Sequence, residues 1–107
     1  MERDPLQLAY LQTVFRAANE AIRRAGRDDC GRLKLICECG SEACRETLEL
    51  TSDEYEEVRS DGRAFALREG HEADVELVVA RFDRFTRVEK VGKAGEWAKQ
   101  HDPRREP

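Results

Sequence analysis

The sequence lacks long apolar runs. None of its segments approaches the roughly 18 apolar residues that a membrane-spanning helix needs, and 39% of its 107 residues are charged. The N-terminal stretch MERDPLQLAY has no basic region followed by an apolar one, so no secretory signal is expected. We therefore expect a cytoplasmic protein whose thiols stay reduced.

Several motifs of catalysis and nucleic-acid binding are also missing. The sequence has no glycine-rich phosphate loop and no Ser–His–Asp arrangement. Residues 35–107 carry twelve basic and eighteen acidic side chains, which would repel a phosphate backbone. A basic patch is conceivable in the N-terminal third, but no aromatic residue lies between its arginines for base stacking. Its members would be Arg16, Arg23, Arg24, Arg27 and Arg32.

The N-terminal region predicts a long amphipathic helix over residues 4–26. Asp4 can cap it, Pro5 suits its first turn, and Gly26 follows the basic residues of its last turn. Apolar residues recur at spacings of three and four, which is the period of one helix face. This stripe consists of Leu8, Leu11, Phe15, Ala18 and Ile22.

The remaining chain predicts an α+β core over residues 33–91 and, over 92–107, a short helix followed by the frayed tail DPRREP, which begins at Asp102. Strands are expected at LKLIC, TLELT and RAFALREG, and the TSDE capping box predicts a short crossing helix after Thr51. The stretch DVELVVARFDRFTRVEKV favours a hairpin turning at Asp83-Arg84, with Val75, Leu77 and Val79 on one face. A helix over its first half is the alternative. The prediction is one domain with a small, mostly antiparallel sheet of four to five strands.

Three cysteines lie within eight positions, in the stretch CECGSEAC. Side chains two apart on a strand share a face, so Cys37 and Cys39 point to one place while Glu38 faces away. Gly40 permits a tight turn that returns Cys44 toward them. Three converging thiolates predict a metal site, most readily for zinc. Reduced core cysteines, a disulfide or redox switch, and an iron–sulfur cluster are the alternatives.

Zinc needs a fourth ligand, which must come from elsewhere in the chain. We predict His71, because it follows Gly70 at a strand end, whereas His101 lies in the polar tail. Cys30 is the rival, seven positions before Cys37. The predicted site is therefore Cys37, Cys39, Cys44 and His71 around a structural Zn²⁺, with Glu72 as either a supporting carboxylate or an exposed one.

The stretches CECGSEAC, LELTSDEYEEVRSD, FALREGHE and RVEKVG resemble a family of small bacterial proteins without a known activity. The shared pattern is C-E-C-x₄-C, E-L-T-x-x-E-Y-E-x-V-R, G-H-E and V-E-K, and it covers roughly residues 33–92. The resemblance includes the four predicted ligands and implies a fold but no activity. It departs from the family at Glu69, where members often have proline, and Cys30 is not part of the pattern.

These observations predict a non-enzymatic zinc-binding module that contacts another protein. Its contact surface would be the N-terminal half of the first helix, at Leu8, Leu11 and Phe15, in a homodimer or with a partner protein. The alternatives are a thiol-based redox sensor that releases zinc on oxidation and, more weakly, a nucleic-acid-binding regulator. A Cys44–His71 nucleophilic pair lacks an orienting group and an oxyanion hole. An acidic run could bind a basic partner or form a solvated face; it comprises Glu46, Glu49, Asp53, Glu54, Glu56 and Glu57.

Overall fold

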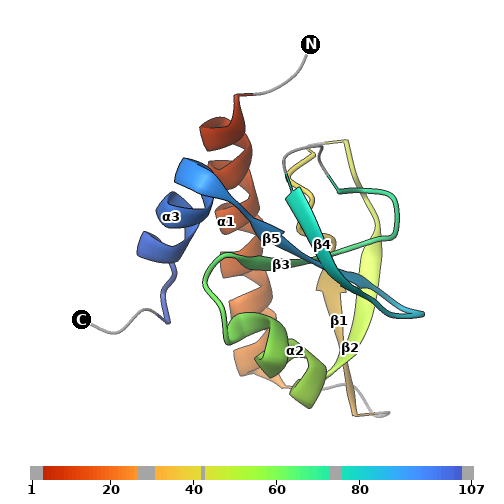
Figure 1. The fold of residues 1–107 in the computed structure, drawn as a ribbon. Coiled ribbons are helices and arrows are strands. Elements are labelled where there is room, and N and C mark those ends of the chain that lie inside the picture. Colours follow the sequence, from red (N-terminus) through yellow and green to blue (C-terminus); the bar gives the residue numbers. More distant parts are fainter. Residues whose placement is uncertain (1–3, 27–30, 42, 73–75, 105–107) are drawn as a thin grey trace.

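A computed structural model describes residues 4–26, 31–41, 43–72 and 76–104, and it confirms the α+β class (Figure 1). The five strands form two small antiparallel sheets instead of the single sheet that we expected, one with order β1-β2 and one with order β3-β5-β4. None of the described helices is both long and apolar enough to cross a membrane. The elements are α1 (Pro5–Ala25), β1 (Arg32–Ile36), β2 (Thr47–Thr51), α2 (Ser52–Arg59), β3 (Ala64–Leu67), β4 (Glu76–Arg81), β5 (Thr86–Lys90) and α3 (Gly92–Gln100).

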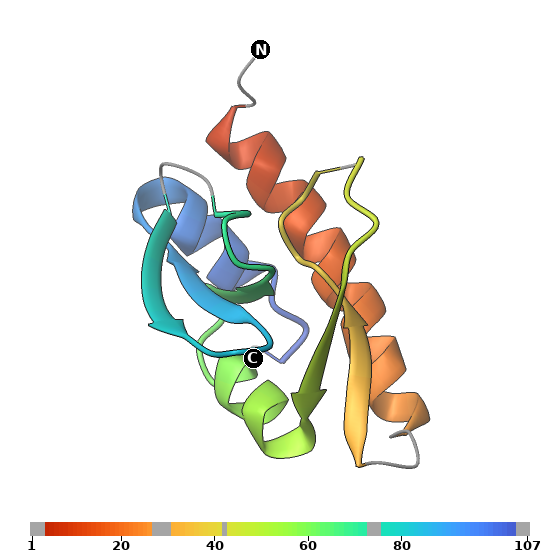
Figure 2. The same ribbon diagram turned by 90° about the vertical axis from the view of Figure 1, so that its right-hand side faces the viewer.

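Helix α1 has the ends that the sequence predicts. The Asp4 side chain accepts a hydrogen bond from the backbone N–H of Gln7 at 3.3 Å, which satisfies one of the free donors of the first turn. The chain leaves the helix at Gly26, whose φ of 116° is open to glycine and costly for other residues. The helix runs along the β1-β2 sheet and packs on α3 as well (Figures 1 and 2).

The buried face of α1 is polar, and this differs from our expectation. The apolar stripe lies at the margin of the interface, where Leu8, Leu11 and Phe15 are each half-buried. The residues that face the interior instead are Ala9, Gln12, Arg16, Asn19 and Glu20. Each of the long polar side chains among them is hydrogen-bonded to another element, which offsets the cost of its desolvation.

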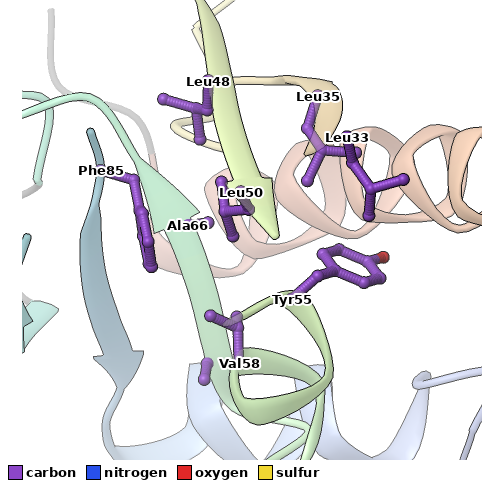
Figure 3. Packing of buried hydrophobic residues seen from close by; sticks show 9 residues of the cluster. Leu33, Leu35, Leu48, Leu50, Tyr55, Val58, Ala66 and Phe85 are labelled. Atoms are coloured by element: carbon purple, nitrogen blue, oxygen red, sulfur yellow. The ribbon is translucent and has the colours of Figure 1, made fainter. Parts of the chain in front are cut away.

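The main apolar core lies between the β1-β2 sheet, α2 and the inner side of β3 (Figure 3). Leu33 pairs with Leu50 and Leu35 with Leu48 across the antiparallel ladder, so one face of this sheet is a leucine layer. Helix α2 begins at the predicted capping box, in which Thr51 and Glu54 exchange hydrogen bonds of 2.8 and 3.1 Å. The helix places its buried side chains, Tyr55 and Val58, against the leucines.

Strands β4 and β5 form the predicted hairpin, which excludes a helix for residues 76–81. Of the face that we assigned to Val75, Leu77 and Val79, Val75 lies outside the described residues. The other two point to solvent, while Val78 packs against Val88 and the second core cluster. A bulge between Val78 and Ala80 shifts the register of this edge strand.

The end of the chain is held through residue 104, whereas we expected a frayed tail from residue 102 on. Asp102 is buried and forms an ion pair with the fully buried Arg59. Arg59 also pairs with Glu20 at 2.8 Å, and Arg104 bridges Glu20 and Glu56 at 2.6 and 2.8 Å. These ion pairs fasten the segment after α3 to both α1 and α2.

Candidate metal centre

Four residues from two distant segments meet at one point: Cys37, Cys39, Cys44 and His71. Their sulfur and nitrogen ligand atoms all lie within 4.8 Å of one another. The cysteines come from the connection between β1 and β2, and the histidine comes from the turn after β3. The chain therefore brings together the donor set that the sequence predicts.

Local backbone structure explains why the cysteine segment folds back on itself. The Cys37 N–H extends the β1-β2 ladder by donating to the carbonyl of Glu46 at 3.2 Å, and Cys44 N–H closes a turn onto the Ser41 carbonyl at 3.2 Å. Between them Gly40 adopts a φ of 79°. A Cβ at Gly40 would lie 2.8 Å from Cδ1 of Leu8, so only glycine permits this close approach to α1.

The histidine is held by an equally short turn. The backbone N–H of His71 donates to the carbonyl of Arg68 at 3.1 Å, directly after β3 ends. This places Nδ1 of His71 at 3.5 Å from Sγ of Cys37 and at 3.7 Å from Sγ of Cys44. The ring nitrogen that faces the sulfurs is therefore Nδ1.

These distances fit tetrahedral zinc. Zinc binds thiolate sulfur at ~2.3 Å and imidazole nitrogen at about 2.0–2.1 Å, so tetrahedral angles separate sulfur from nitrogen by about 3.5–3.6 Å. The two nitrogen–sulfur distances of 3.5 and 3.7 Å agree with that separation to within about 0.2 Å. The donor set, three thiols and one imidazole, is one of the common sets of structural zinc sites.

Hydrogen bonds around the sulfurs favour the thiolate at Cys39 and the protonated thiol at Cys37. A hydrogen bond from the Cys37 thiol, supported by the backbone N–H of Ser41, lowers the pKa of Cys39 to about 5 despite its burial. The same contact with Cys39, together with burial, raises the pKa of Cys37. Sγ of Cys37 also accepts the backbone N–H of Arg68 at 3.3 Å. Such donors orient the sulfurs and offset negative charge when a cation replaces the protons.

Glu38 faces away from the thiols, as predicted, and its side chain is buried. Its carboxylate accepts the side-chain amide of Asn19 at 2.8 Å and the backbone N–H of Ala66 at 2.9 Å. Desolvation by burial raises the pKa of this carboxyl group. The segment that carries the candidate ligands is thereby fixed to α1 on one side and to β3 on the other.

Within the described residues, the other candidate ligand, His101, does not join the group. Nδ1 of His101 donates to the carbonyl of Trp97 at 2.8 Å, and the two rings stack with centroids 4.0 Å apart. The rival ligand Cys30 lies outside the described residues. Glu72, for which we left open a supporting or an exposed position, pairs with Arg81 at 3.8 Å.

The candidate basic and acidic patches are interrupted, by burial of an arginine and by ion pairs with residues of opposite charge. Arg16 is fully buried and donates to the carbonyls of Gly62 and Ala98, so it cannot form part of a basic surface. Arg27 lies outside the described residues. Of the acidic run, Glu54 pairs with Arg84 at 2.7 Å, which leaves a mixed surface. Further pairs are Arg23–Glu56, Arg32–Glu49 and Arg68–Glu46.

Sequence reasoning missed the buried ion pairs behind the candidate site. Lys90 is fully buried and lies 3.1 Å from Glu76, and Gln12 donates to the same carboxylate at 2.8 Å and to the Glu38 carbonyl at 3.0 Å. Desolvation lowers the pKa of Lys90. The one sequence signal was the recurrence of polar residues at helical spacing in α1, and that pattern is equally typical of a solvated face.

Comparison with known proteins finds no matching family model, no matching curated protein and no matching solved structure. The resemblance to the small bacterial family therefore stays a prediction from the quoted motifs. What the chain can do has to be argued from the geometry of its own residues.

Proposed function

We propose that this chain is a small, non-enzymatic zinc-binding module whose metal is structural. The observation that carries the proposal is the convergence of Cys37, Cys39, Cys44 and His71 within 4.8 Å. A four-ligand site of this kind is closed, because the protein supplies every coordination position. Zinc held here contributes its binding energy to folding.

The position of the group supports a structural role. The cysteine segment leaves the β1-β2 sheet, touches α1 at Gly40 and meets β3 through Glu38. His71 follows β3 itself. A metal bound by all four residues would therefore join the two small sheets, of which the two-stranded β1-β2 sheet is too small for independent stability.

The module would act by contacting another protein in the cytoplasm, where thiols stay reduced. In α1 the half-buried Leu8, Leu11 and Phe15 offer less surface than we expected. The outward face of the same half of the helix presents Tyr10 and Val14, with exposed fractions of 57% and 45%. We place the contact surface on that face, for a partner protein or for a second copy.

A thiol-based redox sensor is the second candidate function. It is favoured by Cys44, which is only partly buried while Cys37 and Cys39 are buried. An oxidant would reach this sulfur first and convert a thiolate ligand into a form that binds zinc poorly. A structural site should keep its metal under mild peroxide, whereas a sensor should release it together with formation of a disulfide.

The decisive experiment is metal analysis of protein purified without chelator. We expect one zinc per chain, and we expect removal of that zinc with a chelator to lower the melting temperature. A protein that is metal-free and has the same melting temperature before and after zinc addition would contradict the proposal. Peroxide treatment of the same sample, followed by zinc and thiol measurements, separates the structural role from the sensor.

A further inference from the structure

The four candidate ligands differ in their access to solvent. Cys37 and Cys39 are only 3% and 8% exposed, and Cys44 is the one cysteine among the three that is partly open. Cys44 lines a pocket of about 330 Å³ beside the metal centre. A pocket of that size lies at the lower end of the range for small-molecule sites.

The walls of this pocket indicate what it would accept. The side chains of Phe15 and Ile36 supply apolar walls, and Arg45 and Glu46 contribute one charge of each sign. Glu46 lies 3.7 Å from Arg68, so its charge is partly balanced. A neutral, flat, apolar molecule therefore suits this lining better than an ion does.

We propose that Cys44 is a modification site for neutral, apolar α,β-unsaturated carbonyl compounds, which would bind beside Phe15 and be captured by the thiolate. The inference rests on the proposed zinc site, and it describes how that site is regulated. In the reaction the Cys44 sulfur forms a bond to the β-carbon, and the electron pair of the carbon–carbon double bond becomes an enolate. The enolate takes a proton from water, so no oxidant or reductant is consumed.

The product explains why the reaction would affect the metal. The Cys44 sulfur becomes a neutral thioether, which is a weaker zinc ligand than a thiolate. Only Cys37, Cys39 and His71 then remain as strong ligands. The modified chain would release its zinc and with it the link between the two sheets.

Cys44 and Cys37 both line the pocket, but they differ in reactivity. Sγ of Cys37 is buried and accepts the backbone N–H of Arg68, which lowers its nucleophilicity and its access. Cys39 does not line the pocket. The geometry therefore predicts one order of reaction, with Cys44 first.

The test uses the full-length, zinc-loaded chain with Cys30→Ser, which restricts labelling to the cluster. N-phenylmaleimide is the apolar probe, and N-(4-carboxyphenyl)maleimide has the same ring with a negative charge. Trypsin cleaves after Lys34 and Arg45, so fragmentation of peptide 35–45 locates each adduct by mass spectrometry. Zinc release is followed in parallel with a chromogenic chelator.

We expect the first adduct on Cys44, one zinc released per adduct, and faster reaction with the uncharged probe. Phe15→Ala should slow N-phenylmaleimide by roughly two- to tenfold, the range expected for loss of one aromatic contact. The control Leu77→Ala truncates a solvent-exposed apolar side chain on β4 that lies outside the pocket lining, and it should leave the rate unchanged.

A first adduct on Cys37 or Cys39 would overturn the inference, and so would an unchanged rate in folded Phe15→Ala. An adduct on Cys44 with zinc retained would overturn the proposed regulation. A chain that purifies without zinc would refute the proposed function alone, because the order of labelling can still be measured in it.

Discussion

Glu38 and Ala66 bind each other reciprocally at the outer edge of β3. The backbone N–H of Glu38 donates to the carbonyl of Ala66 at 3.0 Å, and the N–H of Ala66 donates to the Glu38 carboxylate at 2.9 Å. A carboxylate thus replaces the main-chain carbonyl that a neighbouring strand would supply. The segment between two candidate zinc ligands thereby covers a sheet edge that would otherwise expose unpaired backbone groups.

This relationship predicts the effect of Glu38→Ala. The substitution leaves the N–H of Ala66 and one hydrogen bond of Asn19 without an acceptor in the interior, so the free energy of unfolding should fall by about 2–5 kcal/mol. Urea unfolding of the zinc-loaded protein measures it. Glu49→Ala is the matched control, because the Glu49 side chain forms an exposed ion pair with Arg32, and its loss should cost little. Equal effects of the two substitutions would contradict the assigned role of Glu38.

Removal of a cysteine ligand should lower both zinc content and stability. Cys39→Ser replaces a thiolate, whose pKa is already lowered to about 5, with a hydroxyl that does not ionise at neutral pH. We expect the purified variant to retain less zinc and to melt at a lower temperature than the parent. Cys30→Ser, which changes the rival ligand, should leave both quantities nearly intact.

The fourth ligand can be tested with the two histidines of the chain. His71→Ala should strongly weaken zinc retention in competition with a chelator. The reason is that Nδ1 of His71 lies 3.5 and 3.7 Å from two cysteine sulfurs, the separation expected for ligands of one zinc ion. His101→Ala should not, since that ring is stacked on Trp97. Loss of zinc in Cys30→Ser but not in His71→Ala would show that the site has four cysteines.

Local sequence patterns predicted most of the helices and strands, and they also predicted which residues form the candidate metal site. The capping box at Thr51, the Gly26 stop and the alternation of Cys37 and Cys39 each depend on neighbours within a few positions. Such short-range rules do not require the rest of the fold. The division into two sheets was not predictable in this way, because the β3 edge is closed by Glu38, a residue 28 positions earlier.

The orientation of α1 was also beyond local rules. Its polar residues recur at helical spacing just as its apolar residues do, so either face could have packed inward. Partners distant in sequence determine which face of α1 packs inward. Arg16 donates to carbonyls 46 and 82 positions away, and its guanidinium lies 4.8 Å from the centre of the Phe65 ring. Burial of the arginine depends on these acceptors, which no window of sequence contains.

The proposed contact surface on α1 makes a further prediction. If the outward face binds a second copy, Val14→Glu should shift the sedimentation coefficient from dimer to monomer while the melting curve stays cooperative. Leu11→Glu is the comparison, because Leu11 is half-buried and its substitution should destabilise the fold as well. A parent protein that sediments as a monomer at high concentration would exclude the homodimer and leave a partner protein.

Arg104 should govern the acid sensitivity of the C-terminal segment. Its hydrogen bond lowers the pKa of Glu56, and although burial alone would raise the pKa of Glu20, hydrogen bonds from Arg104 and Arg59 outweigh it and lower that pKa too. A carboxyl group with a lowered folded-state pKa stabilises the protein above its unfolded-state pKa, near 4.5. This contribution is lost as the pH falls through the folded-state value.

Arg104→Ala should therefore destabilise the protein at pH 7, and the difference from the parent should shrink as the pH falls below about 4.5. Melting temperatures of both proteins across this range measure the difference, and acid protonation of the metal ligands affects both alike. Arg32→Ala is the control, since its exposed pair with Glu49 should give a small difference at every pH. A difference for Arg104→Ala that stays constant into strong acid would mean that its contacts act by packing, such as its position over the Tyr55 ring, and not through the ionised carboxylates.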